Sequence, residues 1–305
     1  MNSPWMIETT QLTKRLGGKT VVDRVDMLIQ KGEIYGFLGP NGAGKTTTIR
    51  MLLGLAKPSS GQIRILGKDI RKDRIQILRN VGSLVEYPSY YGHLSGYENL
   101  EAVRLLLGTP KSRIDEVLAI VRLTKDAKRP VKGYSLGMKQ RLGIATALLG
   151  GPELLILDEP TNGLDPAGIL EIRELIKSLP RSHGVTILIS SHLLSEVDQM
   201  ATRVGIITGG RMIFQDSIDR LRKQAQSSLR FRVSEPELAA RLLLSLGCQA
   251  SVESGIVTTR QLPDQQTAAI AAKLIEGGHM IYRIEESHAS LESIFLEMTG
   301  TEGSL

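Results

Sequence analysis

The stretch GPNGAGKTT, from Gly39 to Thr47, decides the fold of this chain. It fits the pattern G-x-x-x-x-G-K-[ST], and it stands between the apolar run IYGFL and a segment with helical periodicity. Glycines in this pattern let backbone amides wrap closely around phosphate groups. The lysine supplies charge to the β- and γ-phosphates, and the first threonine hydroxyl is a ligand for Mg²⁺. A glycine-rich strand–helix turn is the structural alternative, but it has no need of the lysine. The predicted phosphate-binding residues are Gly39, Pro40, Asn41, Gly42, Ala43, Gly44, Lys45, Thr46 and Thr47.

A second stretch, ELLILDEPTNGLDP (153–166), ends an apolar run with two adjacent carboxylates, Asp158 and Glu159. Carboxylates at the end of a buried strand are costly unless a metal or hydrogen bonds compensate them. We expect Asp158 to hold Mg²⁺, directly or through water. Glu159 is expected to accept a proton from an attacking water. This pattern is moderately specific alone and strong beside a phosphate loop.

His192, in ISSHLL, follows another apolar run. A lone histidine in that position more often begins a helix or lies in a core. However, the tips of neighbouring strands in one sheet meet where ligands bind, so the company of the other two motifs favours a catalytic role. Ser135, in YSLGMKQR, precedes a helical pattern and is expected to be a helix N-cap when that segment is considered alone.

Composition sets the broad class. The 305 residues are 41% hydrophobic and 23% charged, which suits about two globular domains. A single cysteine, Cys248, excludes a disulfide within the chain and favours a reducing compartment. The net charge of +6 gathers in clusters without interleaved aromatic residues, which favours a solvated surface over nucleic-acid binding. We expect no secretory signal at the N-terminus and no membrane span, so a partner would have to hold the chain at a membrane.

The order of apolar runs predicts an α/β domain over 1–220 with a helical subdomain at about 87–150. A polar linker is expected at 221–228. Residues 229–305 predict a βαββαβ order, typical of a small α+β, ferredoxin-like module, followed by an extra helix. The expected strands of the first domain are 7–14, 21–29, 33–38, 62–66, 81–85, 154–159, 185–191, 203–208 and 211–215, with a helix at 45–55.

Together these motifs resemble the P-loop NTPase domain of the ABC ATPases, in the family's order: phosphate loop, signature YSLGMKQR, LLILDEP, LDP turn and SSH histidine. The resemblance implies that the signature faces the phosphate loop of a second subunit. Ser135 and Gly137 would then touch the γ-phosphate across a dimer. A helix N-terminus with a hydroxyl and a glycine is a suitable anion site.

Three positions depart from the commoner family pattern. The signature has Leu136 and Met138 where the family usually has a glycine and a glutamine, yet Ser135 is kept. Glu86 stands where most members have a glutamine that contacts Mg²⁺, so its carboxylate is a candidate metal ligand. Leu16 stands where an aromatic residue stacks on adenine, which predicts apolar contact with weaker base selectivity.

These departures and the C-terminal SLESIFLEMTG resemble the antibiotic-export branch, which includes bacitracin- and lantibiotic-resistance ATPases. The resemblance implies a homodimer around two ATP–Mg²⁺, an integral membrane permease encoded separately, and a cytoplasmic position on the inner face of the cell membrane. The catalytic residues would be Lys45, Glu159 and His192. The alternatives are a soluble ABC-type ATPase acting on ribosomes or nucleic acid, and a nucleotide-gated binding module without turnover; Glu159 and His192 speak against the second.

Overall fold

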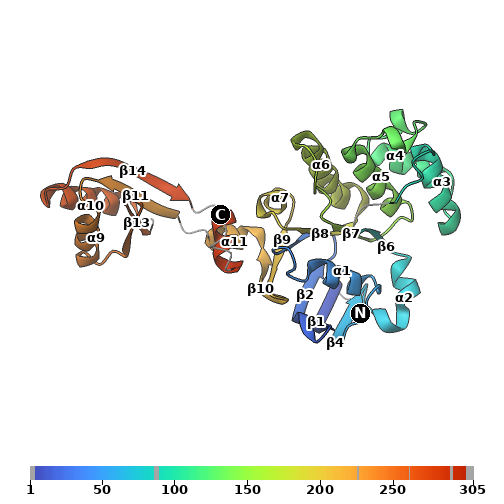
Figure 1. Cartoon of the computed structure of the whole chain (residues 1–305), viewed down its shortest axis with the longest axis horizontal. Coiled ribbons are helices and arrows are strands. Elements are labelled where there is room, and N and C mark those ends of the chain that lie inside the picture. The colour runs from blue at the N-terminus through green and yellow to red at the C-terminus, as the bar shows by residue number, and fades with distance from the viewer. Residues whose placement is uncertain (1–3, 86–88, 225–226, 261, 289–290, 300–305) are drawn as a thin grey trace. The chain divides into compact units, whose positions relative to one another are not determined.

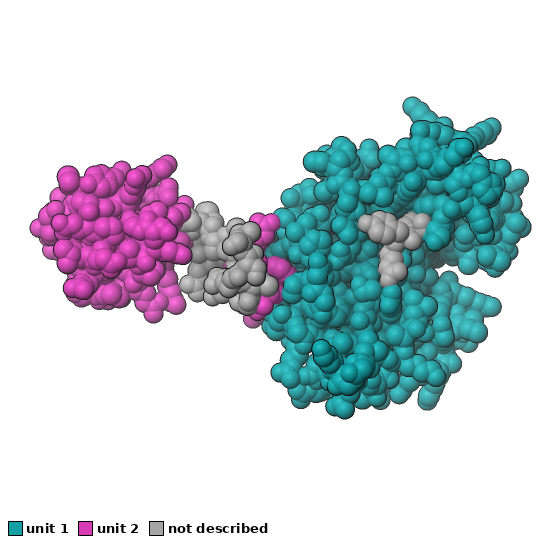
Figure 2. Space-filling view, in the orientation of Figure 1, with its two compact units in different colours: residues 1–218 teal, residues 219–305 magenta. Residues whose placement is uncertain are grey.

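The computed structural model describes residues 4–85, 89–224, 227–260, 262–288 and 291–299. The chain folds as two compact units, Met1–Ile218 and Asp219–Leu305 (Figure 2). Within the described residues, the structure contains no helix with the length and hydropathy that a membrane crossing requires. Glu86 lies outside the described residues, so the structure does not place this predicted metal ligand.

Unit 1 contains a six-stranded sheet in which β6, β7, β8, β3 and β9 run parallel and β10 is antiparallel at one edge. β3, β7 and β8 are buried at every position, which is typical of parallel strands covered on both faces. Gly209 and Gly210, both with positive φ, form the predicted hairpin between β9 and β10. The strands, in spatial order, are β10 (Arg211–Ser217), β9 (Arg203–Thr208), β3 (Ile34–Leu38), β8 (Thr186–Ser191), β7 (Leu154–Asp158) and β6 (Val81–Leu84).

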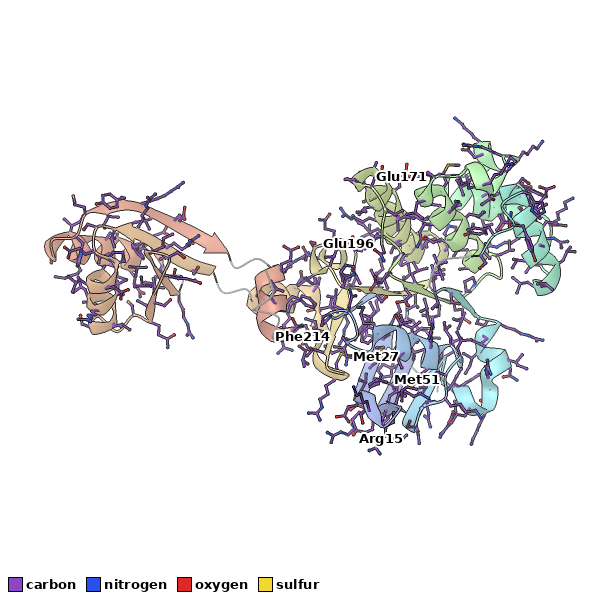
Figure 3. All side chains as sticks on the ribbon, in the orientation of Figure 1. Arg15, Met27, Met51, Glu171, Glu196 and Phe214 are labelled. Carbon is purple, nitrogen blue, oxygen red and sulfur yellow. The ribbon has the colours of Figure 1, made fainter. Side chains whose placement is uncertain are left out.

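A second, antiparallel sheet of unit 1 has the order β2-β1-β4-β5. Its strands are β1 (Trp5–Leu16), β2 (Lys19–Gln30), β4 (Ser60–Ile65) and β5 (Lys68–Asp69). One hydrophobic core joins this sheet, α1 (Lys45–Leu52), α2 (Ile70–Leu78) and the parallel sheet. Met27 of β2 and Met51 of α1, both fully buried, belong to this core (Figure 3).

The predicted helical subdomain is present and consists of α3 (Gly96–Leu107), α4 (Ser112–Ile120), two short 3₁₀ turns (Thr124–Asp126, Val131–Gly133) and α5 (Leu136–Leu148). Two helices, α6 (Pro166–His183) and α7 (Leu194–Asp198), follow β7 and β8. α5 packs directly on β6, and it also packs on α6, which packs on β8, so the helical subdomain is joined to the parallel sheet through both α5 and α6. In Figure 1, α1 and α5 lie on opposite sides of β7 and β8.

Unit 2 has the predicted βαββαβ order and an antiparallel sheet in the order β12-β13-β11-β14. Each strand–helix–strand connection joins two strands that have one other strand between them, as in a ferredoxin-like fold. Its own core includes Phe231 and Leu274, both fully buried. Its elements are β11 (Ser227–Val233), α9 (Pro236–Ser245), β12 (Ala250–Glu253), β13 (Ile256–Arg260), α10 (Asp264–Glu276), β14 (Ile281–His288) and α11 (Leu291–Thr299).

Two local expectations differ from the structure. The expected linker at 221–228 contains the end of helix α8 (Ile218–Gln224) and the start of β11. Ile218 and Leu221 are buried at helical spacing, so an apolar side is present within this charged stretch. The first helix ends at Leu52 rather than at residue 55, because Gly54 adopts a positive φ of 64° that is typical of a helix C-terminus.

Candidate active site

Parallel pairing brings the ends of three strands together. Asp158, the last residue of β7, is paired with Ser190 of β8, and Leu38, the last residue of β3, is paired with Ser191. The residues that follow these strands therefore emerge at one edge of the sheet. This edge, at the carboxyl ends of parallel strands, is the usual ligand site of such folds.

The phosphate loop follows β3 and is packed tightly against its surroundings. A Cβ atom on Gly39 would lie 2.3 Å from the Ile207 carbonyl oxygen, and one on Gly44 would lie 2.7 Å from the Val21 carbonyl oxygen. Gly44 also has φ of 106°. Both positions therefore require glycine for the loop to keep its path.

Lys45 begins α1 and is only 5% exposed. Its Nζ donates hydrogen bonds to the carbonyl oxygens of Gly39 (2.8 Å) and Pro40 (3.3 Å), which holds the ammonium inside the loop. The N-cap of α1 is Gly44, which supplies no side-chain cap, so the first-turn amides have no side-chain partner there. A buried ammonium beside helix-start amides that no side chain caps suits a phosphate ligand.

The two carboxylates follow β7. Asp158 is 7% exposed and accepts a hydrogen bond from the Ser190 hydroxyl, whose oxygen in turn accepts one from the Glu159 amide (3.0 Å). Glu159 has φ of 48°, which is uncommon for a residue other than glycine. Such a conformation persists only where the surroundings hold it firmly, and it is enriched at functional sites.

The carboxylate of Glu159 lies between the two other predicted catalytic residues. Its Oε1 is 3.5 Å from Lys45 Nζ, and its Oε2 is 3.3 Å from His192 Nδ1. The buried Nδ1 of His192 has the distance but not the geometry of a hydrogen bond. The structure therefore brings Lys45, Glu159 and His192 together, as a candidate acid–base site requires.

Hydroxyl and carboxyl side chains behind this group were missed by sequence reasoning. Ser190 bonds to Asp158, and the buried carboxylate of Glu196 accepts hydrogen bonds from the hydroxyls of Thr161 and Ser191. The available signal was the pair of serines that ends the apolar run of β8, because a buried hydroxyl needs a hydrogen-bond partner.

The signature residues occupy a different part of unit 1. Ser135 is exposed and is the N-cap of α5, since its Oγ accepts a hydrogen bond from the Met138 amide (3.2 Å). Gly137 has room for a side chain, because the nearest atoms to an added Cβ lie at 3.9 and 4.0 Å. Leu16, at the end of β1, is 50% exposed.

Among the described residues, no three histidine, cysteine or acidic side chains form a cluster suited to a metal. Mg²⁺ needs no such cluster, since it is commonly held by one or two protein oxygens together with phosphate oxygens and waters. The Thr46 hydroxyl, partly exposed at the start of α1, and the Asp158 carboxylate are oxygen donors of the required kind. They fit a metal that arrives with a nucleotide.

Known proteins resemble this chain over most of its length. The family model for "ABC transporter" matches residues 22–162. The bacitracin transport ATP-binding protein BcrA of Bacillus licheniformis is 46% identical over 97% of both chains. The lantibiotic transport ATP-binding protein SrtF of Streptococcus pyogenes is 48% identical over 70% of this chain and 92% of its own. Among solved structures, CbiO1 of Clostridium perfringens, described as part of the ABC transporter complex CbiONQ, superimposes with a TM-score of 0.66 at 28% identity, covering 80% of this chain and 97% of its own.

Proposed function

Because the chain belongs to the ABC transporter family as an ATP-binding protein, we propose that it forms a homodimer around two ATP–Mg²⁺ and drives a separate permease. The cargo is an antibiotic, a peptide or another amphipathic compound, and the direction is export. The observation that carries the catalytic part is the contact of Glu159 with both Lys45 and His192 beside the phosphate loop.

Each residue has one task in the proposed reaction. Lys45 exchanges its contacts with the loop carbonyls and Glu159 for the β- and γ-phosphates. Glu159, released from that ion pair, takes a proton from the attacking water, while His192 steadies the γ-phosphate as negative charge develops. Mg²⁺, held by Thr46 and Asp158, would neutralise charge on the phosphate oxygens.

The proposed dimer explains the signature helix. One phosphate loop and one signature per chain make two complete sites only when two copies combine. Nothing in the chain's own packing requires glycine at position 137, whereas the close approach of a partner's γ-phosphate would. Ser135 is exposed at a helix N-terminus, which favours negative charge.

A groove of about 530 Å³ at the start of the helical subdomain suits the permease. Its rim includes Leu55 and Leu106, which are 64% and 88% exposed. Tyr90 lines the groove and donates a hydrogen bond to the Lys139 carbonyl in α5 (2.8 Å), and burial raises the pKa of its phenol. A permease segment in this groove would therefore push directly on the signature helix and place the chain on the inner face of the cell membrane.

The descriptions of the two relatives narrow the class of compound that we propose as the cargo. One is described as a bacitracin transport ATP-binding protein and the other as a lantibiotic transport ATP-binding protein. The bacitracin relative matches nearly the whole chain, including the length of unit 2, whereas the lantibiotic relative matches 70% of it. We therefore favour bacitracin or a related compound as the cargo.

The proposal is tested with Glu159→Gln, which keeps the size of the side chain but removes the base. We expect phosphate release to fall by about 100-fold or more, because general-base catalysis contributes about 10²–10⁴-fold. ATP binding should persist, and the ATP-bound variant should run as a dimer in size-exclusion chromatography with light scattering. Glu174→Gln, at an exposed position of α6, is the matched control.

The same variant identifies the partner. Tagged Glu159→Gln, trapped with ATP–Mg²⁺ in its native cells and extracted in mild detergent, should retain one polytopic membrane protein. Recovery of ribosomes or nucleic acid without a membrane protein would favour the soluble alternative. Near-normal phosphate release by Glu159→Gln would contradict the assigned role of the base.

A further inference from the structure

Glu196, in α7, is a buried carboxylate to which the proposed chemistry gives no task (Figure 3). The residue is 9% exposed, and its Oε2 accepts hydrogen bonds from Thr161 Oγ1 (2.6 Å) and Ser191 Oγ (3.2 Å). A buried carboxylate is costly to fold unless several partners compensate it. Its presence beside the site therefore points to a use.

The two hydroxyl donors belong to the two segments that carry reacting groups. Thr161 stands two residues after Glu159, and Ser191 stands directly before His192. Ser191 Oγ also accepts a hydrogen bond from the Leu193 amide (3.0 Å), and its one proton is shared between Glu196 and the Leu193 carbonyl (3.3 Å). Ser191 therefore links the residues on both sides of His192. One carboxylate thus joins the turn after β7 to the turn after β8.

The backbone of Glu159 is held by a separate hydrogen bond to Ser190. Its amide donates to Ser190 Oγ (3.0 Å), while Thr161, two residues on, is held by Glu196. The segment between these anchors contains the positive φ of Glu159. A conformation of this kind is kept by the contacts around it. Glu196 supplies one of them through Thr161, beside the hydrogen bond that the Asn162 amide donates to the Glu159 carbonyl (3.1 Å).

We propose that Glu196 is a positioning residue for ATP hydrolysis, which sets the separation of the Glu159 carboxylate and the His192 ring. The proposal rests on the function proposed above for those two residues. Their contact at 3.3 Å lacks hydrogen-bond geometry, so a small shift of either turn changes it. Small displacements of reacting groups lower rates strongly, by about 100-fold for 1 Å.

The test compares Glu196→Gln with the control Glu174→Gln in the full-length protein. Both hydroxyls donate to the same oxygen, Oε2, so a glutamine keeps the size and can keep an acceptor there, but it removes the negative charge that strengthens both hydrogen bonds. We expect kcat for ATP hydrolysis to fall by about tenfold with KM and ATP affinity unchanged, because only the transition state needs the aligned pair. Glu174→Gln should match the wild type.

Thr161 provides an independent check if Glu196→Gln does not fold. Thr161→Val removes the hydroxyl and should lower kcat, whereas Thr161→Ser keeps the hydroxyl and should restore it. The double variant Thr161→Val/Glu196→Gln should lose less than the sum of the single losses, as expected for directly bonded groups.

Two results would overturn the positioning role. One is a kcat within twofold of wild type in Glu196→Gln and Thr161→Val. The other is a parallel fall of kcat, ATP affinity and melting temperature, which would indicate only a structural role. Glu159→Gln measured in parallel separates the two proposals: if it abolishes turnover while Glu196→Gln does not change it, the positioning role fails and the proposed function stands.

Discussion

The two units of this chain bury different kinds of side chain. Among the described residues of unit 1, Lys45, Asp158 and Glu196 are buried charged groups, and all three lie at or beside the carboxyl edge of the parallel sheet. In the described part of unit 2, the buried polar residues are Thr259 and His279. Unit 1 therefore carries the cost of buried charge where a ligand is expected, and unit 2 has an ordinary apolar core.

This contrast indicates that the buried charges of unit 1 serve ligand binding, whereas the buried residues of unit 2 serve packing. A unit that binds triphosphate needs fixed charges in a low-dielectric site, and hydrogen-bonded partners to hold them. Unit 2 has a core and a sheet without buried Lys, Asp or Glu side chains among its described residues. The comparison predicts that equivalent substitutions have different consequences in the two units.

The largest difference between the units is expected in ATP affinity when a lysine is replaced. Lys45→Met removes the buried ammonium from the phosphate loop and should weaken ATP binding by about 100-fold or more, because charge-assisted contacts with phosphate are strong in a buried site. Lys273→Met, in α10 of unit 2, removes an exposed lysine paired with Glu276 and should change ATP affinity by less than about twofold. Isothermal titration with ATP on both variants measures this. Equal losses would show that the comparison of the units is wrong.

A substitution in the core of unit 2 should have the opposite effect: it should lower stability and leave ATPase activity nearly unchanged. Phe231→Ala empties a fully buried position in the core of unit 2 and should cost about 3–5 kcal/mol of that unit's stability. ATPase activity at 25 °C should remain within about twofold, since the site residues belong to unit 1. Calorimetry should then show an earlier transition for unit 2. Its control, Leu246→Ala, changes a 44% exposed side chain and should move that transition little.

The smallest effect concerns helix caps and pH. In unit 1, Asp69 caps α2 by accepting a hydrogen bond from the Arg71 amide, and the Arg71 side chain lowers the pKa of its carboxyl to about 2. α9 and α10 of unit 2 have no side-chain cap. Because the pKa is lowered on folding, this stabilisation is present above about pH 4 and is lost as the pH falls toward 2.

Melting temperatures of wild type and Asp69→Asn across this range provide the measurement. The wild type should be slightly more stable at neutral pH, and the two curves should converge near pH 2. A constant gap at every pH would show that the charge of Asp69 has no part in the cap.

The sequence predicted the strands of the parallel sheet, the helical subdomain and the element order of unit 2, because hydrophobic period and turn residues are local signals. It did not predict β5, α2, α6 or α7 of unit 1. The hydroxyl network behind the site was not predictable in the same way. Nothing local in SSHLLSEV indicates that Ser190 faces Asp158 or that Glu196 reaches Thr161, since these contacts depend on the β7–β8 register. The helix α8 was missed because its charged residues outweighed two apolar positions.

The strand order of the parallel sheet has a consequence for how the chain reaches its native state. The central neighbours β3, β8 and β7 come from 34–38, 186–191 and 154–158, so closing this edge requires contacts between residues more than a hundred positions apart. Long-range pairing of this kind is slow and comes late in folding. A nucleotide that binds only the closed edge stabilises it by about 2.7 kcal/mol at a concentration of about 100 times its Kd. ATP in the cell would therefore favour fully folded chains over incomplete ones before any transport begins.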